Sequence, residues 1–186
     1  VCGKYLKEQG KLNGNTVVTT VMSNMGLYKA LEREGMRYEQ TAVGDKYVAE
    51  NMMANNYSIG GEQSGHIIFS RYSATGDGIL TSLMLMEACV DKKATLCDLA
   101  KEMKVYPQIL RNVRVADKKT ARENPKVVEA VEAAARALST DGRILVRESG
   151  TEPLIRVMVE AGTEEICAEH VNNVVRVMEE EGLVVE

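Results

Sequence analysis

The chain has 186 residues, 45% of them hydrophobic and 27% charged, which is typical of a globular protein with one large domain or two small ones. Its net charge of -4 argues against nucleic-acid binding, because phosphate backbones are bound by an excess of Lys and Arg. Four scattered cysteines, two distant histidines and no long apolar run favour a cytoplasmic protein with no zinc site, disulfide framework or membrane contact.

Strands alternate with helices in the first part of the chain. Residues 16–22 form a β-branched run of strand length, and residues 27–34 favour a helix that ends at Gly35. A second strand is expected at 36–43 and a second helix at 45–55. Because strands that alternate with helices usually pair in parallel, we expect a mixed, largely parallel α/β sheet.

A hairpin and a buried helix follow. Residues 58–60 and 66–69 flank a glycine-rich turn and predict two short paired strands. The segment 79–90 is apolar on nearly every side, which predicts a helix buried in the core, with Met84 and Met86 among the core residues.

The pattern changes near Pro107, where a helix cannot continue. We therefore expect an α/β domain at 1–104, a hinge at 105–112 and a second domain at 113–186. The second domain should be a small α+β domain with an antiparallel sheet and two helices, because its elements run strand, helix, strand, strand, helix.

Residues 147–156, RESGTEPLIR, join two strands that are expected to pair, so they form a loop at a sheet end. Gly150 permits a positive φ that would turn backbone N–H groups inward. Guanidinium and hydroxyl donors that suit a tetrahedral anion come from Arg147, Ser149, Thr151 and Arg156. A tight hairpin with solvated arginines fits the same residues, and Glu148 and Glu152 oppose an anion site unless they point away.

A second informative segment is GGEQSGH at residues 60–66. Its three glycines let the backbone approach a ligand, and a carboxylate beside a hydroxyl, Glu62 and Ser64, can bind vicinal sugar hydroxyls. His66 could shuttle a proton or bind a phosphate oxygen. A plain turn with a structural histidine is the other interpretation. Lys46, early in the second predicted helix, fits either a ligand contact or a solvated residue.

These segments carry a family resemblance. GEQSGH resembles the sugar-binding loop of the α-D-phosphohexomutases, and RESGTEPLIRV resembles the phosphate-binding loop of their last domain. Both occur in the family's order and at roughly its spacing. The segments TVMSNMGL, VGDKYV and TGDG look most like the phosphoglucosamine mutase branch. The resemblance covers essentially the whole chain, with 1–104 similar to an incomplete third domain and 113–186 to the fourth.

The resemblance implies an isomerase of bacterial cell-wall and UDP-N-acetylglucosamine synthesis that interconverts glucosamine 6-phosphate and glucosamine 1-phosphate. It implies a phosphoserine, Mg²⁺ and a glucosamine 1,6-bisphosphate intermediate. The implied sugar-binding residues are Glu62, Ser64, Gly65, His66 and Lys46, of which His66 and Lys46 would assist at the reacting end. The implied ligands of the nonreacting phosphate are Arg147, Ser149, Gly150, Thr151 and Arg156.

The family's phosphoserine loop and its D-G-D-x-D-R metal loop do not occur in the sequence, which begins at Val1 without an initiator Met. We therefore expect a C-terminal fragment with no catalytic or metal-binding residue of its own, inactive alone and completed by N-terminal domains of the same protein. Three alternatives stay open: a standalone phosphosugar-binding module, a mutase for glucose or mannose phosphates, and a domain whose glycine loops are structural. The sequence leaves the oligomeric state open.

Overall fold

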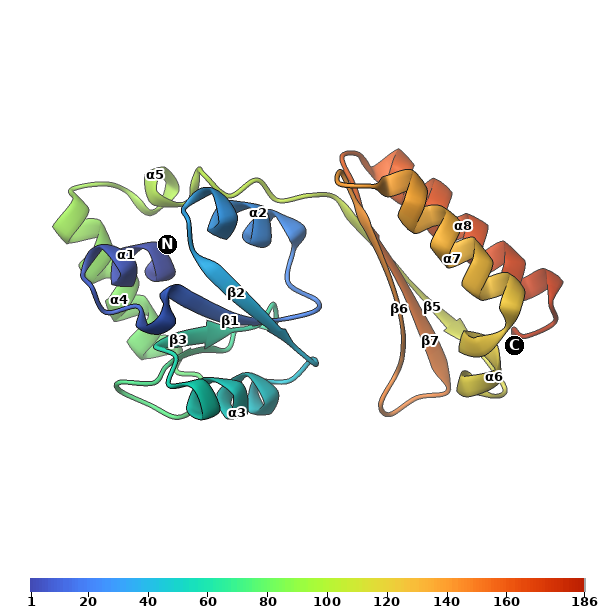
Figure 1. Ribbon diagram of the computed structural model, residues 1–186, viewed down its shortest axis with the longest axis horizontal. Helices are drawn as coiled ribbons and strands as arrows, with labels where there is room; N and C mark the ends of the chain where they lie inside the picture. The colour runs from blue at the N-terminus through green and yellow to red at the C-terminus, as the bar shows by residue number, and fades with distance from the viewer. Residues whose placement is uncertain (186) are drawn as a thin grey trace. The chain divides into compact units, whose positions relative to one another are not determined.

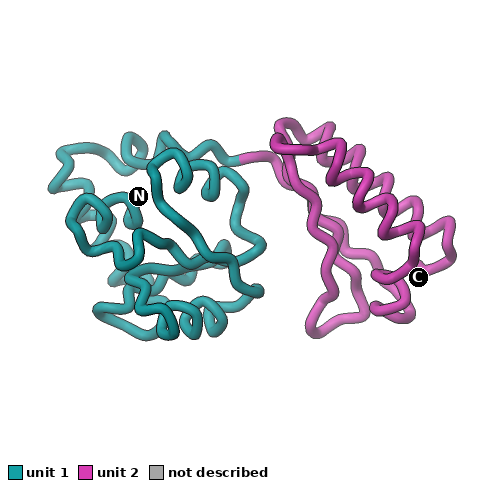
Figure 2. The backbone as a smooth tube through the Cα atoms, in the orientation of Figure 1, with its two compact units in different colours: residues 1–105 teal, residues 106–186 magenta. Residues whose placement is uncertain are grey.

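The structure is a computed structural model that describes residues 1–185 (Figure 1). The chain forms two compact units, residues 1–105 (unit 1) and residues 106–186 (unit 2) (Figure 2). Residues 108–112, which the sequence pattern placed in the hinge, are part of the first strand of unit 2. They are extended because they pair with a later strand of the same unit.

Unit 1 contains a four-stranded mixed sheet. Strand β1 pairs in parallel with β2 and β3, and β4 pairs antiparallel with β3, which gives the order β2-β1-β3-β4 and confirms the predicted sheet type. The elements in chain order are α1 (Cys2–Glu8), a 3-10 turn η1 (Asn13–Asn15), β1 (Thr16–Thr20), α2 (Met25–Arg33), β2 (Arg37–Thr41), α3 (Asp45–Asn55), β3 (Ile59–Gly61), β4 (Ile67–Phe69), α4 (Gly78–Lys92) and α5 (Leu96–Ala100).

Apolar side chains cover both faces of this sheet. On one face, Val18 and Ile68 pack against Val48 and Met52 of α3. Gly60 of β3 allows this contact, because a Cβ there would lie 2.6 Å from the sulfur of Met52. On the other face, α1, α2 and α4 contribute to a larger cluster with the strands: Leu6, Leu12, Leu31, Met36, Ile59, Phe69 and Met84.

Helix α4 is not buried as its sequence predicted. Of its residues only Met84 and Ala88 are buried. Its outer side is exposed, at 77% for Ile79 and Val90 and 54% for Leu83 and Met86. The prediction that Met86 is a core residue was therefore wrong. An all-apolar helix is buried only when neighbours cover every side, and within residues 1–185 only one side of α4 is covered.

Unit 2 contains a three-stranded antiparallel sheet in the order β5-β7-β6, which confirms the predicted α+β class. Helices α7 and α8 cover one face of it (Figure 1). Helix α6 is an additional short helix that the sequence pattern did not predict. The elements are β5 (Gln108–Arg114), α6 (Lys118–Glu123), α7 (Pro125–Leu138), β6 (Arg143–Glu148), β7 (Leu154–Glu160) and α8 (Glu164–Glu180).

The core of unit 2 lies between the sheet and its long helices. Alternate residues of β7, Ile155, Val157 and Val159, point toward the helices and are fully buried. From α8, they meet Cys167, Val171, Val174 and Met178. The intervening β7 residues therefore point to the other face, where the side chain of Glu160 is 0% exposed and accepts a hydrogen bond from Arg143 Nε at 2.7 Å.

Candidate functional site

The segment 61–66 forms a tight turn between β3 and β4. The N–H of Glu62 donates to the carbonyl of His66 at 3.1 Å, and the N–H of Gly65 donates to the carbonyl of Glu62 at 3.0 Å. Gly65 has a φ of 96°, which other residues rarely adopt, so the turn depends on this glycine. The turn brings the side chains of Glu62, Ser64 and His66 together at the C-terminal end of β3.

The carboxylate of Glu62 is fixed from two sides, and its side chain is 9% exposed. One oxygen accepts the N–H of Gly44 at 3.0 Å, and the other accepts the hydroxyl of Ser64 at 2.5 Å. An ionised carboxylate has about four lone-pair positions, so Glu62 can accept further hydroxyl groups from a ligand. The contact from Gly44 was not predicted. The contact links this turn to Gly44, the residue before α3, in the segment GDKY. The glycine itself is the one feature of that segment that could have suggested a close backbone contact.

His66 is joined to the same group. Its Nδ1 lies 2.8 Å from the hydroxyl of Ser64 and 3.6 Å from the Glu62 carboxylate, and 54% of its side chain is exposed. The TGDG segment packs behind it, because a Cβ on Gly76 would lie 3.0 Å from that of His66. An acceptor, a hydroxyl and a titratable ring thus follow one another along an exposed turn, an arrangement that suits sugar hydroxyls and proton transfer.

Lys46 is not gathered into this cluster by any contact within residues 1–185. Its side chain is 74% exposed and its Nζ lies 3.8 Å from Glu50 one helical turn along. Two other polar residues that the motifs contain are helix caps. Asn24 accepts a bond from the first turn of α2, and Asp77 accepts one from the first turn of α4.

In unit 2, the two predicted arginines are cross-strand neighbours. Arg147 of β6 and Arg156 of β7 are directly opposite in the antiparallel register, so their side chains project from the same face. Like charges in this relation repel each other unless an anion lies between them. The Nε atoms of both are buried and have no hydrogen-bond partner in the described part of the chain, so two donors remain for a ligand.

Ser149 and Lys118 lie beside this arginine pair. Ser149 is 1% exposed, and its hydroxyl accepts a bond from Arg156 Nη2 at 3.3 Å. Lys118 Nζ donates to the Ser149 carbonyl at 2.8 Å, which adds a third cation to the base of the loop. Lys118 was not predicted, because it comes from the start of α6, 31 residues earlier, and has no local motif.

The two glutamates of the loop leave Arg147 without a counter-charge. Glu148 alternates to the opposite side of β6 and pairs with Arg122 at 3.1 Å. Glu152 lies 3.4 Å from Arg156, but its side chain is 54% exposed. An exposed pair of this kind contributes little, about 0–1 kcal/mol, so a phosphate can replace it.

Gly150 and Thr151 form the exposed tip of the loop. Gly150 does not have the positive φ that its sequence context predicted. The loop is closed instead by the N–H of Ser149, which donates to the carbonyl of Leu154 at 2.9 Å, and a loop of this length needs no left-handed residue. No atom lies within 4 Å of the position of a Cβ on Gly150, so the backbone there is accessible to a ligand.

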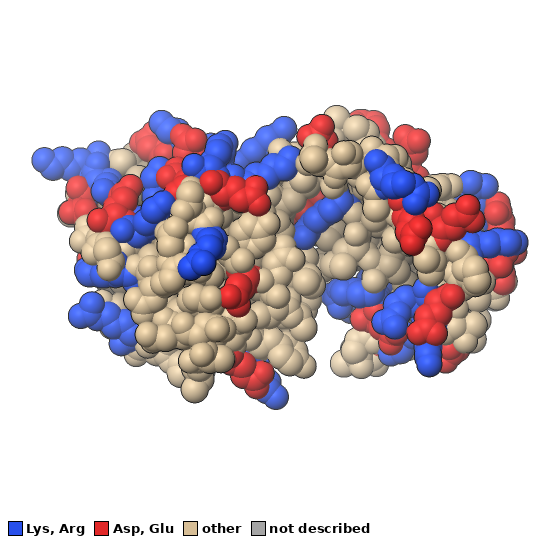
Figure 3. Space-filling view, viewed as in Figure 1, with Lys and Arg blue, Asp and Glu red and all other residues tan. Residues whose placement is uncertain are grey.

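The positive charge of this loop is local. Burial and, to a lesser extent, the neighbouring Arg156 lower the pKa of Arg147 from its usual value. A negative charge between the two guanidinium groups would oppose this lowering of the pKa. On the face shown in Figure 3, acidic and basic side chains are interspersed over both units, so that face has no broad basic surface.

Two family models together match most of the chain. Residues 1–106 match the model of the phosphoglucomutase/phosphomannomutase alpha/beta/alpha domain III, and residues 110–177 match the model of the C-terminal domain of the same proteins. The chain therefore belongs to the phosphoglucomutase/phosphomannomutase family, as the two motifs predicted.

The most similar curated relatives that we compared are bacterial phosphoglucosamine mutases. The chain is 58% identical to that of Lachnospira eligens over 185 residues, which are 100% of this chain and 41% of the relative. It is 57% identical to that of Lachnoclostridium phytofermentans over 98% of this chain and 41% of the relative, and 53% identical to that of Bacillus subtilis over 97% and 40%. The chain thus spans about two fifths of their length.

Solved structures of the family share the fold. N-acetylphosphoglucosamine mutase of Aspergillus fumigatus, in complex with GlcNAc-6P and magnesium, has a TM-score of 0.75 at 20% identity over 95% of this chain and 45% of that chain. A complex of the same fungal enzyme with glucose 1,6-bisphosphate has a TM-score of 0.76 at 21% identity over 98% and 42%. At these identities the likeness establishes the fold alone.

Residues 1–185 do not offer a metal site. No three His, Cys, Asp or Glu side chains in this range lie together as a divalent cation requires. The same range contains no helix with the length and apolar content to cross a membrane. The four cysteines are free thiols.

Proposed function

We propose that this chain is the phosphosugar-binding part of a phosphoglucosamine mutase, which interconverts glucosamine 6-phosphate and glucosamine 1-phosphate. The turn 61–66 binds sugar hydroxyls through Glu62 and Ser64, and the loop 147–156 binds the phosphate that does not react. The observation that carries this proposal is the cross-strand pair of Arg147 and Arg156, with two buried Nε donors and no sufficient counter-charge. The identity of 58% to a bacterial phosphoglucosamine mutase supports the choice of substrate.

The two loops have different tasks in this proposal. The arginines bind a tetrahedral dianion through fixed, charge-assisted hydrogen bonds, and the energy of that contact orients the other end of the sugar. Gly65 shapes the sugar-binding turn, and Gly150 and Thr151 form the accessible part of the phosphate loop. His66 and Lys46 are proposed to assist at the reacting end. Lys46 can reach a ligand because its side chain is largely exposed.

The remaining machinery is proposed to come from an N-terminal part of the same cytoplasmic protein. That part would supply the phosphoserine and the ligands of Mg²⁺, and a glucosamine 1,6-bisphosphate would be the intermediate. Two facts support this part of the proposal. The bacterial relatives are longer than this chain, and α4 exposes apolar residues that a further domain would cover, Ile79, Leu83, Met86 and Val90.

The proposal is tested by NMR titration of the purified chain with glucosamine 6-phosphate, followed at the amides of the loop 147–156. Arg147→Gln should weaken binding about 30-fold, because a hydrogen bond to a charged group is worth roughly 2 kcal/mol. Arg176→Gln, which removes an exposed arginine of α8, is the control and should bind like the original chain. Equal affinity of Arg147→Gln and the original chain would contradict the assigned phosphate loop.

A coupled assay tests the fragment hypothesis separately. We expect no conversion of glucosamine 6-phosphate to glucosamine 1-phosphate by the 186-residue chain. Turnover comparable with that of an intact mutase would contradict it. Binding without turnover, unchanged when the upstream part of the protein is supplied, would favour the alternative of a standalone phosphosugar-binding module.

A further inference from the structure

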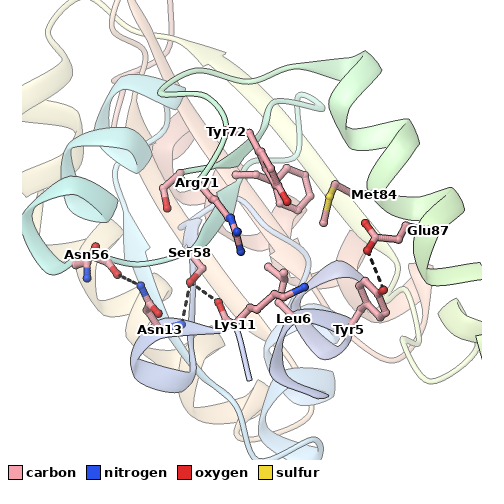
Figure 4. Close-up of a pocket in the computed structure, with 12 residues that line it drawn as sticks. Tyr5, Leu6, Lys11, Asn13, Asn56, Ser58, Arg71, Tyr72, Met84 and Glu87 are labelled. Carbon is pink, nitrogen blue, oxygen red and sulfur yellow. Dashed lines mark hydrogen bonds between the residues drawn. The ribbon is translucent and has the colours of Figure 1, made fainter. Parts of the chain in front are cut away.

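A polar cavity lies at the N-terminal end of β3, whereas the turn 61–66 lies at its C-terminal end. It has a volume of about 380 Å³ and is bounded by α1, η1, the segments before β3 and after β4, and α4 (Figure 4). Because Ser58 directly precedes β3 and Glu62 directly follows it, the cavity and the sugar-binding turn lie at opposite edges of the sheet. None of the residues assigned to sugar or phosphate binding lines it.

Hydrogen bonds between distant segments hold the rim of this cavity. The hydroxyl of Ser58 accepts the N–H of Asn13 at 2.8 Å and donates to the carbonyl of Lys11 at 2.7 Å. The amide of Asn13 donates to the carbonyl of Asn56 at 2.9 Å, and the hydroxyl of Ser70 donates to the carbonyl just before Ser58 at 2.8 Å. The cavity is therefore formed in advance, and a ligand need not order it.

Two cations face this cavity. Figure 4 shows the guanidinium of Arg71 and the side chain of Lys11 directed into it. Neither has an ion-pair partner among residues 1–185. The guanidinium of Arg71 lies over the ring of Tyr72, with Cζ 5.9 Å from the ring centroid. Glu87 on the far wall is instead bound to the hydroxyl of Tyr5 at 3.1 Å. Two unpaired like charges that face one small space favour an anion.

The other walls indicate what the anion is attached to. Leu6, Phe69 and Met84 form a buried apolar floor, and the ring of Tyr72, which is 58% exposed, offers a flat surface beside it. Glu87, which also lines the cavity, can accept a hydroxyl or amine of an organic body attached to the anion. Cavities that hold small molecules have volumes of about 300–1,000 Å³, so this one suits a phosphate with a compact organic body.

We propose that this cavity binds a small organic phosphate ester, with its phosphate between Lys11 and Arg71 and its body over the apolar floor. The inference does not depend on the proposed mutase function, because it uses different residues. It assigns unit 1 a second ligand site, separated from the first by the length of β3.

The test is an amide-resolved NMR titration of the whole chain with glucosamine 6-phosphate and, separately, with inorganic phosphate. Saturable shifts are expected at Asn13, Ser58 and Arg71, with glucosamine 6-phosphate binding at least fivefold more tightly than inorganic phosphate. The double variant Lys11→Gln/Arg71→Gln should weaken this binding at least tenfold. The control Lys119→Gln/Arg136→Gln makes the same change in net charge on unit 2 and should leave it unchanged.

The two sites give separable results. In Arg147→Gln the shifts at Asn13 and Ser58 should persist, whatever happens in the loop 147–156. The proposal is overturned if these amides show no saturable shift, or if the double variant and its control bind equally well. Equal affinity for glucosamine 6-phosphate and inorganic phosphate would also overturn it, because the organic body would then contribute nothing.

Discussion

The two units present their binding groups in opposite ways. In unit 2, Arg147 and Arg156 project from neighbouring strands whose other face packs against helices, and their Nε atoms are buried. In unit 1, Ser64 and His66 stand on an exposed turn, and only Glu62 is largely buried. Unit 2 thus presents partly buried guanidinium groups on strands, whereas unit 1 presents mostly exposed polar groups on a turn.

If both loops bind the ligand as proposed, the difference predicts which property of binding each unit controls. Partly desolvated guanidinium groups on strands interact strongly with a dianion and lose little entropy on binding, so unit 2 should set the affinity. Hydroxyl, carboxylate and imidazole groups on a turn can meet sugar hydroxyls in more than one pose, so unit 1 should set which sugar is accepted. The predictions below probe this contrast.

The largest expected effect concerns the stability of unit 2. Arg143→Ala leaves the fully buried Glu160 without the cation that bonds it at 2.7 Å, and should destabilise unit 2 by about 3 kcal/mol. Arg136→Ala, at an exposed pair on α7, should cost less than about 0.5 kcal/mol. Urea unfolding followed by hydrogen exchange in each unit measures both. Similar costs for the two variants would show that the pair of Arg143 with buried Glu160 stabilises unit 2 no more than an exposed pair does.

Substitution of one valine in each unit compares the burial of β7 in unit 2 with that of α4 in unit 1. Val157→Thr buries a hydroxyl at a fully buried position of β7 and should cost about 2 kcal/mol. Val90→Thr on α4, where the side chain is 77% exposed, should cost less than about 0.5 kcal/mol. Thermal unfolding of both variants checks this. A large cost at Val90 would mean that the outer side of α4 is covered in solution.

Substrate recognition gives a smaller effect. Glu62→Gln keeps the size of the side chain but replaces one acceptor oxygen with a donor, and should weaken binding of glucosamine 6-phosphate about tenfold, or about 1.4 kcal/mol. Binding of inorganic phosphate at the loop 147–156 should not change. Calorimetry with both ligands separates the two outcomes. An equal loss of affinity for both ligands would mean that the turn 61–66 does not contact the sugar.

The smallest effect is a gain in stability. Arg147→Gln removes one of two opposed cross-strand charges, and should stabilise ligand-free unit 2 by about 0.5 kcal/mol while it weakens phosphate binding. The gain should shrink in high salt, because screening already reduces the repulsion. Thermal melts at low and high salt test this. A loss of stability in low salt would contradict the repulsion that we infer.

The sequence predicted those features whose cause is local. The helix at 45–55 has the predicted bounds, and both glycine-containing segments lie between paired strands. These features are predictable because the spacing of apolar residues and the positions of turn residues can be read directly from neighbouring positions in the sequence. Two motifs in the right order were enough to identify the family.

Features that depend on distant residues were not predictable. The amide of Gly44 that bonds Glu62 and the Lys118 ammonium that bonds the loop 147–156 come from segments remote in sequence. Hydrophobicity alone predicted a buried α4, because it cannot show which sides of a helix other elements cover. Gly150 was assigned a left-handed φ that the loop closure between Ser149 and Leu154 does not need.

The central claim is that Arg147 and Arg156 bind one phosphate together. It is tested most directly by following their side-chain Nε–H signals in ¹⁵N NMR while glucosamine 6-phosphate is added, with Arg176 as the internal control. We expect both signals to move with the same apparent dissociation constant while that of Arg176 stays in place. If only one of the two moves, or neither does when the ligand is bound, the shared phosphate site does not exist.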